Sequence, residues 1–281
     1  MNINVYIKIA RPNQWLKNLM LFFPPFLGGL IFNPGIACSG IIPFISFCLA
    51  SSSMYVLNDI LDRENDSKHP VKQRRPISSG KVPVLTAYGI SAALLLCSLI
   101  LSTRLSLSFF MILVCYMGLS LAYSFKLKEL PIVDIFCISS GFLLRLQAGG
   151  EVFQISISEW LFLSVFLLSV FLSTGKRLGE KNALGLEAGN HRKTLTSYPE
   201  GFLDGTMYMT GAAVLVTYTL YVISRHSLVY TVPVCAFGLL RYIFRVKAGE
   251  GGDPTESLLK DIPLFLTGVL WAFMIGWSIY R

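Results

Sequence analysis

Residues 36–66 read IACSGIIPFISFCLASSSMYVLNDILDREND, an apolar run that passes directly into a cluster of acids. The apolar part, residues 36–57, has the length of about 17–25 residues with which a helix spans a bilayer. A bilayer offers backbone groups no water, so such a run must satisfy its hydrogen bonds internally, as a helix does. This stretch therefore predicts a transmembrane helix that ends in a polar segment.

Runs of this kind recur along most of the chain. Of its 281 residues, 53% are hydrophobic and only 14% are charged, whereas a soluble domain carries about a quarter charged residues. We therefore expect an all-α fold: a polytopic membrane protein with a single transmembrane domain over residues 1–281. About nine spans are expected, at residues 15–33, 36–57, 84–102, 106–122, 132–150, 159–174, 206–224, 228–245 and 263–280.

The first run, residues 15–33, follows Lys8 and Arg11, has Lys17 near its start, and is not ended by a small-residue cleavage pattern. This predicts a retained helix and not a signal peptide. The six cysteines all lie in apolar segments without CxxC spacing. They are predicted to be buried thiols, with neither a disulfide framework nor a zinc site.

The charged residues gather on one side of the predicted spans. Twenty of the 24 bases fall in the N-terminal arm and in alternate loops, which the positive-inside rule places in the cytoplasm. Fourteen of the 16 acids share that side, although acids contribute little to orientation. We expect a protein of the inner (cytoplasmic) membrane whose N-terminus and polar site face the cytoplasm, with loops 58–83 and 175–205 forming the site and its lid.

Four oxygen-bearing side chains follow the span at 36–57 in the pattern NDxxDxxxD: Asn58, Asp59, Asp62 and Asp66. On a helix the three aspartates would fall within about 60° of one face, and clustered carboxylates repel unless a cation lies between them. Oxygen ligands without His or Cys favour Mg²⁺. The alternative is a solvated helix end, but ionisable groups bordering a membrane span are usually functional. We expect a magnesium site at the three aspartates.

Bases follow the acids directly, in the stretch HPVKQRRPISSG at residues 69–80. Lys72 and Arg75 can supply a point charge and a planar fork for phosphate oxygens. Arg74 is explained equally well as a positive-inside charge. His69 has no second His or Cys spaced to join it, so a structural role is expected.

The run NDILDRENDSKHPVKQRRPISSG at residues 58–80 resembles the first aspartate motif of the UbiA-type intramembrane prenyltransferase superfamily. The resemblance extends over essentially the whole chain. It implies a bundle of about nine helices with a polar cavity on the cytoplasmic side and Mg²⁺ as cofactor. Members of the superfamily typically carry a second aspartate-rich motif, but here that place reads STGKRLGEKNAL at residues 173–184, a basic stretch with a single acid.

A basic stretch is a poor second Mg²⁺ site but a good anion site. In this respect the chain resembles the decaprenyl-phosphate phosphoribosyltransferase branch of the superfamily. The stretches RPNQWLKNLMLFFP at the start and DPTESLLKD near the end look similar to that branch too. The resemblance implies transfer of a 5-phosphoribosyl group from phosphoribosyl pyrophosphate to a polyprenyl phosphate in cell-envelope biosynthesis, with release of pyrophosphate.

The resemblance implies roles for particular residues of this chain. Catalytic roles are expected for Asp59, Asp62, Asp66, Lys72 and Arg75. Substrate-binding roles are expected for Lys17, Asn18, Asn58, Tyr123, Lys126, Lys176, Arg177, Glu180 and Arg192. Asp134 is expected to orient Lys126 and Lys128, the bases that follow the span at 106–122, or to lie near the metal.

Several alternatives stay open at this point. Lys17 and Asn18 fit an interfacial anchor as well as a phosphate site. Lys176, Arg177 and Glu180 have the spacing of salt bridges on one helix. The chain could also be an ordinary prenyltransferase with an aromatic acceptor, which predicts a second acidic motif, or a transporter, which predicts internal repeats. A homo-oligomer is left open, and no nucleic-acid partner is expected.

Overall fold

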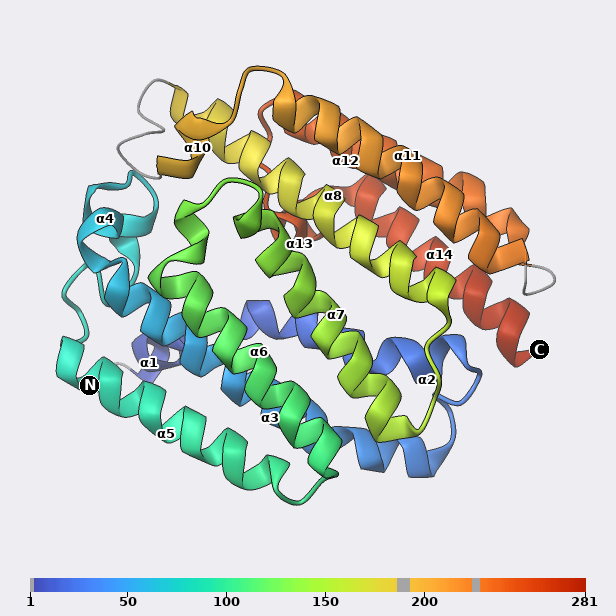
Figure 1. Cartoon of the computed structure of the whole chain (residues 1–281), viewed down its shortest axis with the longest axis horizontal. Helices are drawn as coiled ribbons and strands as arrows, with labels where there is room; N and C mark the ends of the chain where they lie inside the picture. Colours follow the sequence, from blue (N-terminus) through green and yellow to red (C-terminus); the bar gives the residue numbers. More distant parts are fainter. Residues whose placement is uncertain (1–2, 186–192, 224–227) are drawn as a thin grey trace. The chain divides into compact units, whose positions relative to one another are not determined.

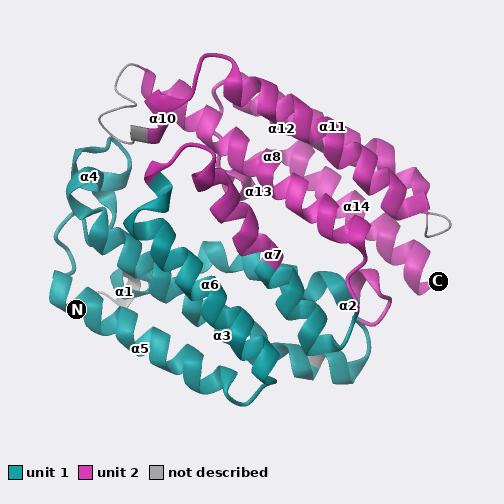
Figure 2. Ribbon diagram, viewed as in Figure 1, with its two compact units in different colours: residues 1–25, 31–128, 144–155 teal, residues 26–30, 129–143, 156–281 magenta. Residues whose placement is uncertain are grey.

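The computed structural model describes residues 3–185, 193–223 and 228–281 (Figure 1). These residues are almost entirely helical, and none of them forms a strand. They divide into two compact units (Figure 2). Unit 1 comprises residues 1–25, 31–128 and 144–155, and unit 2 comprises residues 26–30, 129–143 and 156–281.

Unit 1 is built mainly from three long helices. These are α3 (Pro34–Leu61), α5 (Val84–Ser102) and α6 (Leu107–Phe125). The shorter elements are α1 (Ile3–Ile9), the 3-10 helix η1 (Pro12–Phe22), α4 (Arg63–Lys68) and η2 (Lys72–Arg74). The helix α7 (Val133–Phe153) begins in unit 2 and ends in unit 1, so the two units share one helix.

Small polar residues join α3 to α5. Ser53 Oγ donates to the Ser91 carbonyl oxygen at 2.8 Å, and Ser91 Oγ donates in return to the Ser53 carbonyl oxygen at 3.1 Å. Small side chains let helices approach closely where lipid supplies no hydrophobic driving force. The serine run at residues 51–53 therefore packs α3 inside unit 1, next to an apolar core that includes Phe47, Phe109 and Leu113.

Unit 2 contains four long helices. They are α8 (Glu159–Leu184), α11 (Phe202–Ile223), α12 (Val232–Lys247) and α14 (Ile262–Tyr280). Short elements connect them: α10 (Lys193–Ser197), η5 (Val229–Thr231) and α13 (Pro254–Lys260). Phe171 and Met207 are fully buried in the core that α8, α11 and α12 share.

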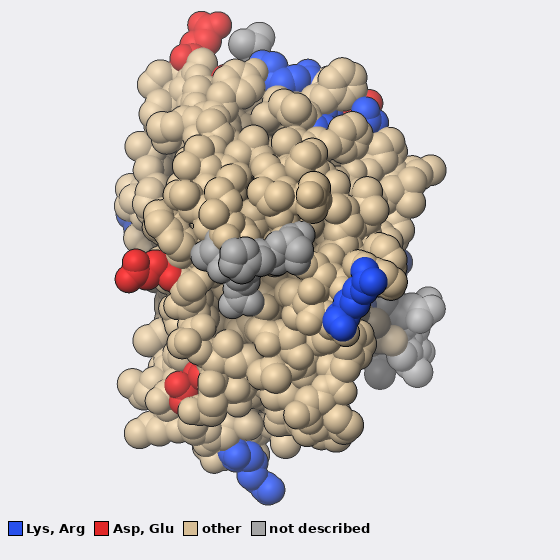
Figure 3. All heavy atoms as spheres, turned by 90° about the vertical axis from the view of Figure 1, so that its right-hand side faces the viewer, with Lys and Arg blue, Asp and Glu red and all other residues tan. Residues whose placement is uncertain are grey.

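Seven helices of the described residues are long and apolar enough to cross a membrane. The expected multi-pass character is therefore supported, but the count of nine spans is not confirmed. Many of their large apolar side chains are exposed, including Leu85, Leu107 and Ile262, as lipid contact requires. Figure 3 shows one face of the molecule on which uncharged residues predominate.

The expected single helix over residues 15–33 is wrong. The chain forms η1 up to Phe22, and α2 (Phe23–Leu27) follows. Pro24 and Pro25 lie in the first turn of α2, where their missing N–H groups have no helical partner to lose. The chain then turns at Gly29, whose φ of +76° suits glycine.

The expected span at 159–174 is too short. Helix α8 runs on for ten residues to Leu184, so the basic stretch at residues 173–184 is helical. The expected loop 175–205 therefore begins as a helix, and its residues 186–192 lie outside the described part of the chain.

Candidate functional site

The acids of the NDxxDxxxD pattern lie where α3 passes into α4. Asp62 is the single residue between α3 and α4, with a φ of −88° and a ψ of 3°. Its N–H still donates to the Asn58 carbonyl oxygen at 2.9 Å, and the Asp66 N–H donates to the Asp62 carbonyl oxygen at 2.8 Å. The three aspartates thus lie on two helical segments that bend at Asp62, and not on one straight helix as expected.

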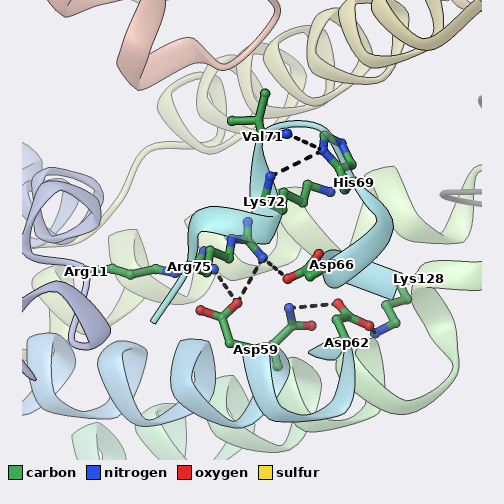
Figure 4. Close-up of polar contacts among 10 residues, drawn as sticks. Arg11, Asp59, Asp62, Asp66, His69, Val71, Lys72, Arg75 and Lys128 are labelled. Carbon is green, nitrogen blue, oxygen red and sulfur yellow. Dashed lines mark hydrogen bonds and ion pairs between the residues drawn. The ribbon is translucent and has the colours of Figure 1, made fainter. Parts of the chain in front are cut away.

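Each of these aspartates contacts a base (Figure 4). Arg75 donates to Asp59 at 3.0 Å and also pairs with Asp66. Arg11 pairs with Asp59 from the other side, and its guanidinium lies over the Tyr55 ring at 5.3 Å from the centroid. Lys128 pairs with Asp62. Asp59 and Asp66 are buried, so the bases neutralise charges that would otherwise be costly.

The donor set fits a hard divalent cation. All four side chains of the pattern offer oxygen, which Mg²⁺ prefers. Asn58 Nδ2 donates to Asp62 at 3.0 Å, while Asn58 Oδ1 is buried without a hydrogen-bond partner among the described residues. No group of three or more His, Cys, Asp or Glu within residues 3–185, 193–223 and 228–281 has the spacing of a metal site. The carboxylates would have to turn from their bases to share an ion.

Burial raises the pKa of the Asp66 carboxyl group above its usual range, although the charges of Arg75 and Lys72 oppose the rise. Desolvation disfavours a carboxylate ion, and opposite charges nearby favour it. Asp66 therefore lies where an additional cation would stabilise its ionised form.

The turn after α4 places the bases of residues 69–80. His69 Nδ1 accepts hydrogen bonds from the backbone N–H groups of Val71, at 3.2 Å, and Lys72, at 3.4 Å (Figure 4). The ring thus holds the turn in the structural role expected for it. Arg74 is exposed, whereas Arg75 points back to the acids.

In unit 2, Arg177 lies in a buried cluster. Its Nε donates to Asp134 Oδ2 at 2.6 Å, and a second nitrogen donates to Glu180 at 2.7 Å. Asp134 is 0% and Arg177 is 1% exposed. The pairing of Arg177 with Glu180 three residues later is the salt bridge left open above. Asp134 orients Arg177, a base of α8 that was not among those expected for it.

Tyr198 completes this cluster. Its hydroxyl donates to Asp134 Oδ1 at 2.6 Å and accepts from the Ile132 N–H at 2.8 Å. Burial, together with the hydrogen bond to Asp134, raises the pKa of the Tyr198 hydroxyl well above its usual range. The hydroxyl thus remains a donor at physiological pH.

Lys176 is more accessible than Arg177. Its ammonium donates to Asp253 Oδ2 at 2.8 Å, and 31% of its side chain is exposed. Of the two bases predicted on this turn of α8, Lys176 is thus the one that can reach a ligand. Arg192 lies outside the described residues.

Asn18 is buried inside unit 1 and is not an exposed anchor at the membrane–water interface. Its Oδ1 accepts from Arg145 Nε at 2.7 Å, and its Nδ2 donates to Ser51 Oγ at 3.2 Å. Arg145 also donates to the Tyr116 hydroxyl at 2.9 Å. Asn18 therefore joins η1 to α3 and α7, and the Arg145 guanidinium is hydrogen-bonded inside unit 1, as a charge within a membrane-spanning helix requires.

The remaining predicted residues lie near the surface of unit 1. Lys17 and Tyr123 are partly buried, and Lys126 is exposed. Trp15 Nε1 donates a hydrogen bond to Ser52 Oγ at 2.9 Å, which holds the start of η1 on α3.

Sequence reasoning missed Arg11 and Lys128 as partners of the acids. Arg11 was counted only as an orienting charge, and it adopts a left-handed backbone with a φ of 50°, a conformation rare enough in a non-glycine residue to suggest function. Lys128 lies two residues after the Lys126 that was favoured. The short 3-10 helix η3 (Leu127–Glu129) decides which of the two faces Asp62.

The sequence of this chain is similar to that of a known protein family. The profile of the UbiA prenyltransferase family matches residues 22–269. The chain is 35% identical to the decaprenyl-phosphate phosphoribosyltransferase of Mycolicibacterium smegmatis, over 98% of this chain and 92% of the relative. It is 32% identical to the protein of the same name from Mycobacterium tuberculosis H37Rv, over 96% of this chain and 92% of the relative.

Solved structures agree on the fold. A UbiA homologue from Archaeoglobus fulgidus bound to DMAPP and Mg²⁺ superposes with a TM-score of 0.74 at 19% identity, covering 98% of each chain. The same homologue has also been solved bound to Cd²⁺, with a TM-score of 0.69. The expected all-α bundle is therefore confirmed, and the structures from Archaeoglobus fulgidus show Mg²⁺ and Cd²⁺ bound to a protein of this fold.

Proposed function

Because the chain belongs to the UbiA prenyltransferase family, we propose that it transfers the 5-phosphoribosyl group from phosphoribosyl pyrophosphate to a polyprenyl phosphate of the decaprenyl type. The reaction releases pyrophosphate. Relatives at 32–35% identity that bear the name of this activity support the proposal. The observation in this chain that carries it is an asymmetry: acids gather at Asp59–Asp66, whereas the turn of α8 at Lys176 and Arg177 is basic.

The acidic pattern would serve the diphosphate of the donor. Asn58, Asp59, Asp62 and Asp66 would hold Mg²⁺, which neutralises charge on the pyrophosphate as it leaves C1 of the ribose. Arg75 and Lys72 would donate to the diphosphate oxygens. Arg11 and Lys128 pair with the same acids, so they keep the carboxylates neutralised before substrate arrives.

The basic turn of α8 would serve a phosphate that has no metal of its own. Lys176 supplies the ammonium that contacts this phosphate. Arg177 is enclosed by Asp134 and Glu180, so it positions this turn of the helix and does not contact substrate.

The rate of phosphoribosyl transfer then depends on how the two substrates are aligned and on how well the charge of the leaving pyrophosphate is stabilised. The phosphate of the lipid acceptor is already an anionic nucleophile, so no strong general base is needed. Its oxygen attacks C1 as the bond to pyrophosphate breaks, with inversion at C1. The enzyme contributes by holding both reactants in line and by stabilising the charge that develops on the leaving group.

The proposal includes an orientation. The substrate phosphoribosyl pyrophosphate is soluble and cytoplasmic, so the acidic pattern and the basic turn would both face the cytoplasm from the inner membrane. This agrees with the distribution of bases in the sequence.

A radiolabel assay on the purified full-length protein in detergent tests the function. One sample contains phosphoribosyl pyrophosphate and a polyprenyl phosphate, and the other contains a polyprenyl diphosphate and an aromatic acid. We expect labelled lipid from the first sample only, and its loss with EDTA. Product from the second sample alone would reject phosphoribosyl transfer in favour of ordinary prenyl transfer.

Matched variants sharpen this assay. Asp62→Asn should lower product formation by about 100-fold or more, since it removes charge from the proposed metal site. Glu64→Gln is the control, because Glu64 lies between Asp62 and Asp66 in the sequence but its side chain is exposed, and we expect activity within about twofold of wild type. Equal losses in both variants would contradict a specific role for Asp62.

A further inference from the structure

The segment between α12 and α14, residues 248–261, lies directly against α8 in unit 2. A Cβ atom built on Gly179 would come within 2.7 Å of the Gly252 nitrogen. A Cβ atom built on Gly252 would come within 2.5 Å of the Gly175 carbonyl oxygen. The contact is thus backbone to backbone, and glycine at these positions makes it possible.

Side chains of α12 hold both ends of this segment. The Tyr242 hydroxyl donates to the Gly252 carbonyl oxygen at 2.7 Å. At the other end, Asp261 accepts hydrogen bonds from Arg241, at 2.8 Å, and from Arg245, at 2.7 Å. The segment is therefore fixed in place on α8 and not a loosely attached loop.

The two carboxylate oxygens of Asp253 have different partners. Oδ1 accepts from the Thr255 N–H at 3.1 Å and from the Glu256 N–H at 3.2 Å, which caps α13. Oδ2 accepts from Lys176 Nζ at 2.8 Å. Asp253 thus ties the start of α13 to the accessible base of α8.

Lys176 retains capacity for a ligand. An ammonium carries three N–H donors, and within the described part of the chain the recorded partner of Lys176 is Asp253. The charge-assisted hydrogen bond to Asp253 restricts the otherwise flexible Lys176 side chain. It therefore limits the directions in which the other N–H groups of the ammonium can point.

We propose that Asp253 is a positioning residue: through the glycine contact of residues 175, 179 and 252 it holds the Lys176 ammonium ready for a phosphate monoester. This inference rests on the proposed function and deepens it. Two sources supply such a group, the lipid acceptor and the 5-phosphate of the donor. Asp253 itself does not contact substrate.

Steady-state kinetics with both substrates tests the inference. Lys176→Met should raise one KM about tenfold or more, as for loss of a hydrogen bond to a charged group. Asp253→Asn keeps an N-cap of equal quality but removes the charge, so it should raise the same KM about threefold to tenfold with kcat within about twofold. The substrate whose KM rises identifies the source of the phosphate.

The double variant separates positioning from a merely structural role. If Asp253 acts through Lys176, Asp253→Asn causes no further rise in KM when Lys176 is already replaced by methionine. An unchanged KM in Asp253→Asn, or an effect of equal size in both backgrounds, would overturn the inference.

Chemical labelling gives a readout that needs no turnover, and so separates this inference from the proposed function. Lys176 is acetylated with acetic anhydride and followed by mass spectrometry, with and without inorganic phosphate. Asp253→Asn should speed acetylation of Lys176, because the amine nitrogen is no longer held in a charge-assisted hydrogen bond, and phosphate should protect it less. Lys260, exposed on α13 and paired with Glu256, is the internal control. Unchanged labelling of Lys176 would overturn the inference even in an inactive preparation.

A glycine variant tests the contact itself. Gly252→Ala should reproduce the KM change of Asp253→Asn, since its Cβ would push the segment off α8. Gly205→Ala on α11 is the control, because a Cβ there meets nothing within 4 Å. A folded Gly252→Ala protein with wild-type KM values would show that the contact does not position Lys176.

Discussion

Asp59 lies between two guanidinium groups, those of Arg11 and Arg75, although the three residues are far apart in sequence. In unit 2, Arg177 likewise lies between two acids, Asp134 and Glu180. At the residue scale, these buried charges are thus paired, as their desolvation requires. The pairing also indicates what each base can do. A base enclosed by acids, such as Arg177, holds neighbouring residues in place, whereas a partly exposed base such as Lys176 can bind a ligand.

Asp261 offers a test of such a pair by pH. Its hydrogen bond with Arg241, supported by the Leu264 N–H and Arg245, holds the pKa of the Asp261 carboxyl well below its usual range. A depressed folded-state pKa contributes stability that is present above the unfolded pKa of about 3.9 and is lost as pH falls through the folded value.

We therefore expect the melting temperature of wild type in detergent to exceed that of Asp261→Asn by a constant amount between about pH 5 and 8. The difference should shrink below about pH 4. Asparagine retains the cap that Asp261 provides to α14, so the comparison reports the charge. A difference that grows on acidification would contradict the assigned pairing.

At the scale of elements, close backbone approaches govern packing. The second half of α7 meets η1 at Gly149, where a Cβ atom would come within 2.1 Å of the Leu21 carbonyl oxygen. The 3-10 helix η1 occupies the place where the sequence predicted a long first span. Its position depends on this glycine and on the hydrogen bond between Asn18 and Arg145.

Gly149→Ala should lower the free energy of unfolding by about 1–3 kcal/mol, the usual cost of overpacking. Gly89→Ala on α5 is the matched control, because its Cβ would meet nothing within 4 Å. There alanine should be neutral or stabilise by up to about 1 kcal/mol through helix propensity. Thermal and denaturant unfolding in detergent measure both, and an equal response would show that η1 does not contact α7 at this point.

At the scale of the whole molecule, the chain is a multi-pass membrane protein of the UbiA prenyltransferase family. The apolar surface of its long helices leaves few places for charge, and the paired acids and bases cluster at the helix ends and short connecting elements. An activity that uses a soluble donor and a lipid acceptor suits this division between polar ends and apolar sides.

Orientation can be measured within unit 1. Glu64→Cys, after α3, should react with a membrane-impermeant maleimide only from the cytoplasmic side, in inverted vesicles. Gln154→Cys, after α7, should react only in intact spheroplasts. Both positions are exposed, and wild-type protein supplies the background of its six native cysteines. The reverse pattern would contradict the orientation inferred from the bases.

The sequence by itself determined the class of protein and the chemistry of its acidic pattern. Apolar runs can only be helices in lipid, and the oxygen donors at residues 58–66 specify a hard cation whatever their exact placement. The sequence predicted the helix boundaries less well. Helix α8 extends past its apolar run to Leu184, because charged residues continue a helix once tertiary partners such as Asp134 and Asp253 neutralise them.

Only the tertiary structure decided which charges pair. Arg11, Lys128 and Asp253 are separated from their partners by 48 to 77 residues, and no local periodicity relates them. The left-handed backbone of Arg11, the short turn before Lys128 and the contact of Gly179 with Gly252 place these side chains. Helical spacing specifies the face on which a side chain lies, whereas the partner across that face depends on how the helices and connecting segments pack.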